Sequence, residues 1–254
     1  MGKIIAITNQ KGGVGKTTTA INLSAALAER RKNVLLIDID PQGNATSGLG
    51  IDKNNLENSI YELLLGDCSV KDCIYDTAVK GLKIIPSNIN LSGAEIELVE
   101  MDKKEYLLKK RTDRIKSNYD YIIIDCPPSL SMLTIDALTA ADSVIVPIQC
   151  EYYALEGLTQ LIKTVDLIRE RLNDDLHIEG IVFTMFDTRT NLSSQVVDTV
   201  KKNLNQNIYD TAIPRNVRLA EAPSYGMPIT LYDTRSSGAV AYRNLAKEII
   251  RKRR

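Results

Sequence analysis

The sequence predicts an α/β protein: a mostly parallel, twisted sheet with helices on both faces. Two observations support this fold class. Short β-branched runs alternate with longer segments of helical period, as in βαβ units with right-handed crossovers. Several short runs are almost continuously apolar, such as VLLID, YIIID and VIVPI, which indicates strands that are covered on both faces. We expect residues 1–254 to form a single domain.

Each expected element rests on one of these two patterns. Short runs rich in Ile and Val predict strands at Lys3–Thr8, Asn33–Asp38, Leu82–Pro86, Tyr121–Asp125, Ser143–Pro147 and Ile178–Thr184. Helical spacing predicts helices at Lys16–Arg30, Asp102–Ser117, Thr134–Ala141, Gly157–Leu172, Leu192–Leu204 and Ser237–Lys252. The stretch Ile51–Val79 has the weakest pattern, and we expect a small helical insertion there. Because parallel sheets bind ligands at the carboxyl ends of their strands, functional residues are expected in the loops after the strands.

Composition excludes several classes of protein. The chain has 254 residues, 44% hydrophobic and 25% charged, which is typical of a globular protein. No apolar run approaches the roughly 20 residues of a membrane-spanning helix, and the apolar stretch at the N-terminus is too short for a signal peptide. A cytoplasmic protein is therefore expected.

The cysteines and the single histidine argue against several kinds of site. Cys68, Cys73, Cys126 and Cys150 form no C-x-x-C pair, so we expect reduced and mostly buried thiols. His177 is the only histidine, which disfavours a Ser-His-Asp triad or a histidine-based zinc site.

Charge is unevenly distributed, although the formal net charge is zero. From Asp187 to Arg254, Lys and Arg outnumber Asp and Glu by six, and the rest of the chain has the opposite excess. Such asymmetry indicates an anionic partner, although a solvated face would give the same count.

A glycine-rich loop follows the first expected strand. It reads Gln10-Lys11-Gly12-Gly13-Val14-Gly15-Lys16-Thr17-Thr18 and runs into a helix. Its glycines allow backbone N–H groups to surround phosphate oxygens, and the helix N-terminus adds partial positive charge. Lys16 is expected to reach the β- and γ-phosphates, and the Thr17 hydroxyl to bind Mg²⁺. The usual G-x-x-x-x-G-K-[ST] pattern has Gly where this chain has Gln10, and this loop carries an additional lysine, Lys11.

Two acidic motifs end other strands. Asp38 and Asp40 stand two residues apart at a strand end and point the same way, as they also would in an acidic loop that caps a helix. Asp125 ends an apolar strand in the Walker B arrangement, which predicts that it holds Mg²⁺ directly or through water. Cys126 follows it and is interpreted as structural, because the chain offers too few suitably placed cysteines for an iron–sulfur cluster.

The string KGGVGKTTT resembles the deviant Walker A motif of the ParA/MinD/nitrogenase-iron-protein class of P-loop ATPases. The resemblance implies an ATP-sandwich homodimer, with ATP as substrate and Mg²⁺ as cofactor, in which Lys11 reaches the nucleotide of the other subunit. The expected catalytic residues are then Lys11, Lys16 and Asp40, with Asp40 positioning the attacking water. Asp38 would lie near Mg²⁺, so the expected metal-site residues are Thr17, Asp38 and Asp125. The ATP phosphates would be bound by the residues of the loop, which are Lys11, Gly12, Gly13, Val14, Gly15, Lys16, Thr17 and Thr18.

Similarity to the ParA/Soj partitioning ATPases extends over nearly the whole chain. It rests on strings such as PQGNAT from Pro41, EYYALEGL from Glu151 and IPRNVRL from Ile213. By this resemblance, Pro214, Arg215 and Asn216 would border the adenine, and Glu151 would face the nucleotide across the dimer. The family's ATP-bound dimer binds double-stranded DNA without sequence preference, and a ParB-type partner stimulates slow hydrolysis and release. Such a protein is cytoplasmic and nucleoid-associated.

The family resemblance also implies a DNA-binding surface in the basic part of the chain. The expected residues are Arg189, Arg218, Arg243, Lys247 and Arg251. Contacts to phosphates would make binding salt-sensitive. The alternative is a solvated face, and a frayed tail at Arg251–Arg254.

Three other functions share parts of this pattern. A MinD-like membrane-cycling protein would need large apolar residues on a C-terminal amphipathic helix, but Val240, Leu245, Ile249 and Ile250 are interpreted as facing the sheet. No membrane partner is therefore expected. An iron-protein-like electron carrier would need cluster cysteines. A metabolic P-loop ligase would need a substrate pocket beyond the γ-phosphate. The stimulus that raises ATP hydrolysis (DNA with a partner peptide, lipid vesicles or a small acceptor) distinguishes these functions.

Overall fold

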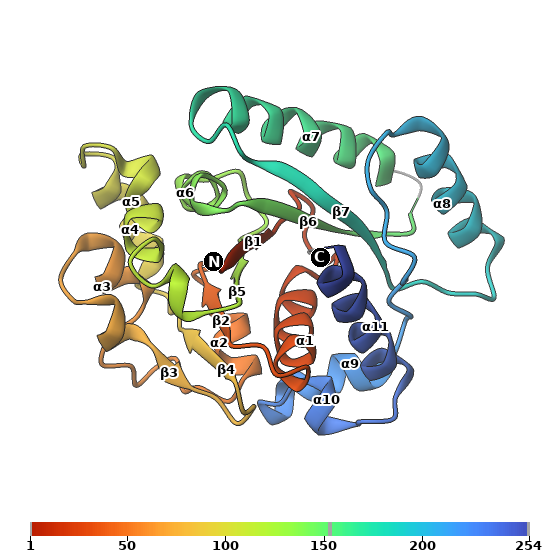
Figure 1. The fold of residues 1–254 in the computed structure, drawn as a ribbon, viewed down its shortest axis with the longest axis horizontal. Coiled ribbons are helices and arrows are strands. Elements are labelled where there is room, and N and C mark those ends of the chain that lie inside the picture. Colours follow the sequence, from red (N-terminus) through yellow and green to blue (C-terminus); the bar gives the residue numbers. More distant parts are fainter. Residues whose placement is uncertain (1, 152–153, 253–254) are drawn as a thin grey trace.

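A computed structural model describes residues 2–151 and 154–252, and it contains a seven-stranded sheet in the order β3-β4-β2-β5-β1-β6-β7 (Figure 1). The strands are β1 Lys3–Ile7, β2 Val34–Asp38, β3 Tyr75–Asp76, β4 Leu82–Ile85, β5 Tyr121–Asp125, β6 Ser143–Gln149 and β7 His177–Thr184. All neighbouring pairs are parallel except β3 with β4. The predicted α/β class and the six predicted strands are confirmed, and the antiparallel edge strand β3 is an addition.

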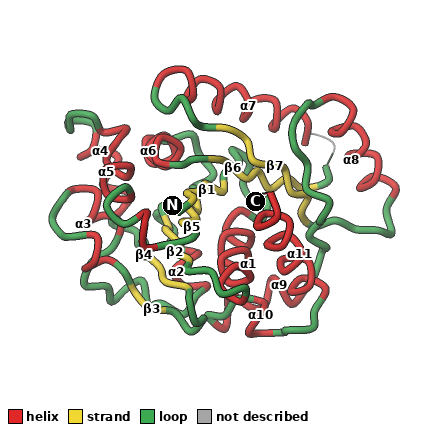
Figure 2. Tube along the Cα trace, in the orientation of Figure 1, coloured by secondary structure: helices red, strands yellow, loops and turns green. Residues whose placement is uncertain are grey.

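Helices connect the strands and cover the sheet on both sides (Figures 1 and 2). They are α1 Lys16–Glu29, α2 Asn44–Gly48, α3 Ile60–Leu65, α4 Leu91–Leu98, α5 Leu107–Thr112, α6 Met132–Ala140, α7 Ala154–Arg171, α8 Asn191–Asn203, α9 Val217–Glu221, α10 Ile229–Tyr232 and α11 Ser237–Lys252. Helices α1 and α11 pack together on one face of the sheet, and α4 to α7 lie over the other. No helix in the described part of the chain is both long and apolar enough to cross a bilayer.

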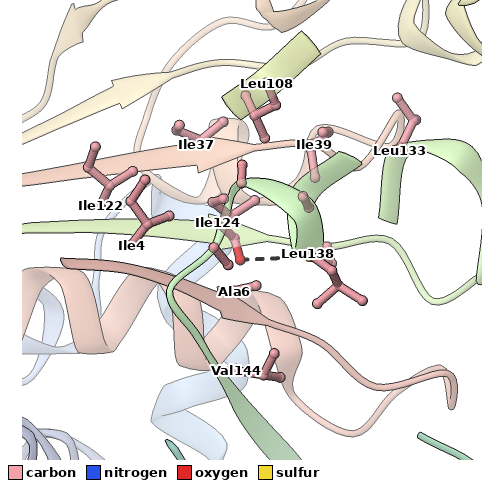
Figure 3. Packing of buried hydrophobic residues seen from close by; sticks show 14 of the residues in the cluster. Ile4, Ala6, Ile37, Ile39, Leu108, Ile122, Ile124, Leu133, Leu138 and Val144 are labelled. Atoms are coloured by element: carbon pink, nitrogen blue, oxygen red, sulfur yellow. Dashed lines mark hydrogen bonds between the residues drawn. The ribbon is translucent and has the colours of Figure 1, made fainter. Parts of the chain in front are cut away.

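Alternation along the strands divides the core into two layers. Ile4, Ala6, Ile37 and their neighbours point toward α5 and α6 (Figure 3), whereas Ile5 and Ile7 join the layer beneath α1 and α11. Both sets are fully buried, which explains why the central strands carry apolar residues on both faces. Each of these buried isoleucines contributes roughly 1.5–3 kcal/mol when it leaves water, so the sheet is a rigid base for the loops at its carboxyl edge.

The prediction of one helix over Asp102–Ser117 was wrong. The segment contains a 3₁₀ turn at Lys104–Tyr106, then α5, and a second 3₁₀ turn at Lys116–Asn118. Lys103 has a left-handed φ of 54°, which continuous helix does not allow. Asp136 of α6 then accepts the Leu108 N–H through both carboxylate oxygens, at 3.0 and 3.1 Å, and this caps α5 from outside.

The expected insertion at Ile51–Val79 is only partly helical. It contains the short helix α3, a 3₁₀ turn at Val70–Cys73 and the edge strand β3. Ser59 and Glu62 form a capping box at the start of α3, which is a signal that the sequence already carried. The expected burial of the cysteines is confirmed for Cys73, Cys126 and Cys150, whereas Cys68 is partly exposed.

Candidate nucleotide-binding site

The loop between β1 and α1 adopts the backbone that its glycines permit. Gly13 and Gly15 have φ of 75° and 86°, a region in which side chains with a Cβ are strained. Gly15 caps α1 without any side-chain hydrogen bond to the helix N–H groups. Those N–H groups therefore stay available to an anion at the positive end of the helix.

Three distant elements hold this loop in place. The Asn9 amide donates to the Pro147 carbonyl at 2.8 Å, and its Oδ1 accepts from the Lys11 N–H at 3.0 Å. The Thr184 hydroxyl at the end of β7 donates to the Val14 carbonyl at 2.8 Å. Gln10, which replaces the usual glycine, donates from Nε2 to the Thr164 hydroxyl of α7 at 3.0 Å. The sequence departure therefore has a structural role, which is to anchor the loop to α7.

The two lysines of the loop differ in environment. Lys16 is buried, and its ammonium donates to the Lys11 carbonyl at 3.0 Å across the loop. Burial lowers the pKa of Lys16, while Asp125, Cys126 and Asp40 oppose this shift. Lys11 instead forms an ion pair with Glu151 of the same chain, and both side chains are largely exposed. Two of the expected site residues are thus in contact, although 140 positions separate them in sequence.

Asp125 fits a metal site at the base of the loop. Its carboxylate is completely buried, and no described residue gives either oxygen a hydrogen bond of ordinary geometry. Burial, and then the neighbouring Asp38, raise the pKa of Asp125 well above its ordinary value, while the Thr17 hydroxyl and the Lys16 ammonium oppose this. A divalent cation would satisfy both oxygens. Among the described residues, no three His, Cys, Asp or Glu side chains form a metal site by themselves, which fits Mg²⁺ that takes other ligands from phosphate and water.

Asp38 is held by hydrogen bonds within its own loop, and its expected place near Mg²⁺ stays a prediction. It lies beside Asp125 in the sheet register, but its own loop already engages both of its oxygens. It accepts from the Asp40 N–H at 3.1 Å, the Thr46 N–H at 2.9 Å and the Thr46 hydroxyl at 2.8 Å. Burial raises the pKa of Asp38 to about 6 despite these hydrogen bonds. Asp38 therefore braces the loop, and Asp125 is the better candidate for the metal.

The Asp40 carboxylate is fixed by a turn of its own loop. It is buried, and its Oδ1 accepts from the Gln42 N–H at 2.9 Å. The Gly43 N–H donates to the Asp40 carbonyl at 2.9 Å. This tight turn fixes the carboxylate beside Lys16 and Asp125, to whose electrostatics it contributes. The position suits a group that orients a water molecule.

A pocket of about 360 Å³ adjoins the phosphate loop. Its lining includes Gly15 and Thr18 of the loop and Pro214, Arg215 and Asn216, the residues that we expect to border the adenine. Asn216 caps α9 by accepting from the Arg218 N–H at 2.8 Å. The sequence analysis missed Met185 and Tyr242, which also line this pocket. No local sequence pattern marks either residue.

A larger groove of about 1240 Å³ runs between the Asp187–Arg189 loop and α11. It brings together Arg189, Lys247 and Arg251 of the expected DNA-binding set, and it adds Arg215 and Arg235. The other two expected residues lie outside its lining: Arg243 donates to both carboxylate oxygens of Glu29 on α1, at 2.8 and 2.9 Å, and Arg218 pairs with Glu221 at 2.9 Å.

The charge of the groove is partly compensated. Arg189 is 83% exposed and pairs with Asp187 at 2.7 Å, and this arginine lowers the pKa of Asp187. Arg253 and Arg254, which contribute to the sequence charge count, lie outside the described residues.

Comparisons with known proteins agree with this geometry. Residues 2–178 match the family model for an AAA domain, AAA_31. The sporulation initiation inhibitor protein Soj of Bacillus subtilis is 62% identical over 249 residues, 98% of each chain. The crystal structure of cobyrinic acid a,c-diamide synthase from Mycobacterium smegmatis with bound ADP and magnesium has a TM-score of 0.88 at 39% identity. The match covers 99% of this chain and 95% of the synthase chain. A plasmid partition protein of Borrelia burgdorferi B31 bound to AMPPNP has a TM-score of 0.82 at 28% identity, over 99% and 100% of the two chains.

The fold and the loop define the class as a P-loop nucleotide-binding protein of the ParA/MinD type, whose homologous structures hold adenine nucleotides and magnesium. Within that class, the chain belongs to the Soj/ParA family of chromosome-partitioning proteins.

Proposed function

We propose that this protein is an ATP-dependent switch for DNA segregation, which dimerises around ATP, binds non-specific DNA and releases it on hydrolysis. The observation that carries this proposal is that the pocket beside the phosphate loop and the basic groove share lining residues. Pro214, Arg215, Asn216 and Val217 line both the pocket beside the phosphate loop and the basic groove. A nucleotide that orders these residues would also act on the groove, and this gives ATP a physical route to the DNA surface.

The chemistry follows from the site residues. Lys16 and the loop N–H groups hold the phosphates, and Thr17 and Asp125 hold Mg²⁺, which neutralises phosphate charge when it is bound. Asp40 orients the water that attacks the γ-phosphate, with its carboxylate fixed by the Gln42 N–H. Phosphoryl transfer depends mainly on positioning and charge, so one oriented carboxylate is sufficient.

Dimerisation requires Lys11 to exchange partners. In the single chain its ammonium pairs with Glu151. In the proposed dimer it leaves Glu151 and reaches the nucleotide of the other subunit, where it stabilises developing charge as a trans-acting cation. Two copies of the groove on one rigid body then bind DNA multivalently. A ParB-type partner would stimulate hydrolysis, and the protein would be cytoplasmic and associated with the nucleoid.

Two variants test the nucleotide part of the proposal. Asp40→Ala keeps the loop and the Mg²⁺ ligands, so it should bind ATP, stop turning it over and accumulate as a dimer in size-exclusion chromatography. Rapid turnover by this variant would contradict the role of Asp40. Lys16→Ala should lose nucleotide affinity and, with it, the dimer. A Lys16→Ala variant that still dimerised with ATP would contradict the sandwich.

The M. smegmatis protein is named a synthase, which makes a metabolic function the alternative to test. The rate of phosphate release can be compared with duplex DNA plus a partner peptide, with anionic lipid vesicles, and with a small carboxylate acceptor plus an amine donor. Stimulation by DNA and peptide supports the proposal. Stimulation by the acceptor pair, with amide product formed, would replace it with a ligase function.

A further inference from the structure

We propose that Cys68 and Cys73 form a redox-modifiable dithiol that closes into a disulfide. Their sulfur atoms lie 2.9 Å apart as free thiols, across the 3₁₀ turn Val70–Cys73. A disulfide bond is about 2.05 Å long, so the two sulfurs need to approach by less than about 1 Å. The C-x-x-C rule did not find this pair because four residues separate the two cysteines.

The surroundings favour a disulfide over a metal. Among the described residues, no group of three or more His, Cys, Asp or Glu side chains could hold an ion, and two thiols leave a soft metal with too few ligands. The two sulfurs also differ in access, since Cys68 is partly exposed and Cys73 is buried in the core layer that contains α3. Cys68 is therefore the attacking thiol, and Cys73 is the resolving thiol.

The oxidant in this reaction is a small-molecule disulfide such as oxidised glutathione. The Cys68 thiolate attacks one sulfur of glutathione disulfide, forms a mixed disulfide and releases one glutathione thiol. Cys73 then gives up its proton and attacks the Cys68 sulfur, which releases the second glutathione. The protein loses two electrons and two protons, and one glutathione disulfide is reduced to two thiols.

The reaction can be tested on the whole folded protein with oxidised glutathione, by intact mass and peptide mapping. Wild type should lose two thiols, retain no glutathione and yield a peptide linked through Cys68 and Cys73. Cys73→Ala should hold one glutathione on Cys68, whereas Cys68→Ser should leave Cys73 unmodified. A stable glutathione adduct on Cys68 in the wild type, or four unmodified thiols, would overturn the proposal.

A separate contact leads to a second inference, which rests on the proposed function: we infer that Lys53 is a positioning residue for Asp40. The Lys53 ammonium donates to the Gln42 carbonyl at 2.6 Å, and the Gln42 N–H donates to Asp40. The Lys53 stem passes close to Gly43, where an added Cβ would meet the Lys53 Cδ at 3.0 Å. Lys53 therefore clamps the turn that aims the Asp40 carboxylate.

Lys53→Met keeps the stem and removes the charged donor. We expect kcat for ATP hydrolysis to fall roughly tenfold, the lower end for a hydrogen bond from a charged group, with KM for ATP unchanged and with Lys53→Arg restoring most of the rate. Exposed Lys71 provides the matched control, Lys71→Met, which should leave kcat unchanged. In an Asp40→Ala background, Lys53→Met should cause no further fall in the residual rate.

Two outcomes separate the inference from the function on which it rests. If Asp40→Ala is inactive while Lys53→Met turns over like Lys71→Met, the clamp is wrong and the role of Asp40 stands. If Asp40→Ala turns over at the wild-type rate, the proposed function itself fails, and the clamp fails with it.

Discussion

Thr184→Val tests how β7 holds the phosphate loop. The Thr184 side chain is 2% exposed, and its hydroxyl donates to the Val14 carbonyl at 2.8 Å and approaches the Ile148 carbonyl at 3.1 Å. Valine has nearly the same shape but no hydroxyl. The substitution therefore leaves buried carbonyls without their donor and frees the middle of the loop from the sheet.

The expected loss of stability follows from the loss of that donor. A buried polar group left without its hydrogen bond costs about 1–3 kcal/mol. At ~2.1 cal/mol/K per residue, the 254 residues give an unfolding entropy of roughly 0.5 kcal/mol/K, so the melting temperature should fall by about 2–6 °C. The affinity for an ATP analogue should fall as well, by up to about tenfold for each 1.4 kcal/mol needed to order the loop again.

Thermal unfolding by circular dichroism without nucleotide, and titration with a non-hydrolysable ATP analogue, measure the two effects. Thr184→Ser keeps the hydroxyl and should recover most of both losses. Thr159→Val removes an exposed hydroxyl on α7 that donates to the Leu155 carbonyl, and it should change little. If Thr184→Val melted and bound the analogue like wild type, the hydroxyl would not be holding the loop.

Three further predictions concern the loop after β2, a buried carboxyl and the basic groove. Gly43 has φ of 59°, and an added Cβ would lie 2.7 Å from the Ser87 carbonyl oxygen. Gly43→Ala should therefore lower the free energy of unfolding by about 1–2 kcal/mol and slow phosphate release, while the affinity for nucleotide is kept. Hydrolysis at the wild-type rate would contradict this. Burial raises the pKa of Asp136 to about 8, so the folded protein binds the extra proton and its stability should fall as pH rises from about 4 to 8. Asp136→Asn can still accept the Leu108 N–H, and its melting temperature should depend less on pH than that of the wild type. An unchanged pH dependence would contradict the raised pKa of Asp136. Arg243 is paired with Glu29 and lies outside the groove, so Arg243→Ala should weaken DNA binding less than Lys247→Ala, and the reverse order in a fluorescence anisotropy titration would contradict the groove.

Local sequence patterns were sufficient to predict the elements whose residue types follow from burial or from backbone conformation. Central strands such as β5 are apolar on both faces, and the glycines of the phosphate loop occupy positions that need positive φ. These residue types have few alternatives at such positions. The strands, the loop and the adjacent helix α1 could therefore be located from the sequence.

Contacts between distant residues were not accessible in the same way. The Lys11–Glu151 pair and the bond from Thr184 to Val14 join residues 140 and 170 positions apart, and no local spacing indicates them. Asp38 and Asp125 look alike as carboxylates at strand ends. Only the structure reveals that Thr46 donates to Asp38 and that Asp125 receives no hydrogen bond of ordinary geometry from the described residues. The break before α5 likewise depends on Asp136, which lies on another helix.

Binding to non-specific duplex DNA, measured in Asp40→Ala without nucleotide, with ADP and with ATP over a range of salt, tests the central claim most directly. The account predicts binding only with ATP, weakening steeply as salt rises because the contacts are to phosphates, together with loss of binding in Lys247→Ala and Arg251→Ala. Equal binding in all three nucleotide states would contradict gating by ATP. No binding in any state, with the ATP dimer still forming, would leave a nucleotide switch whose target is not DNA.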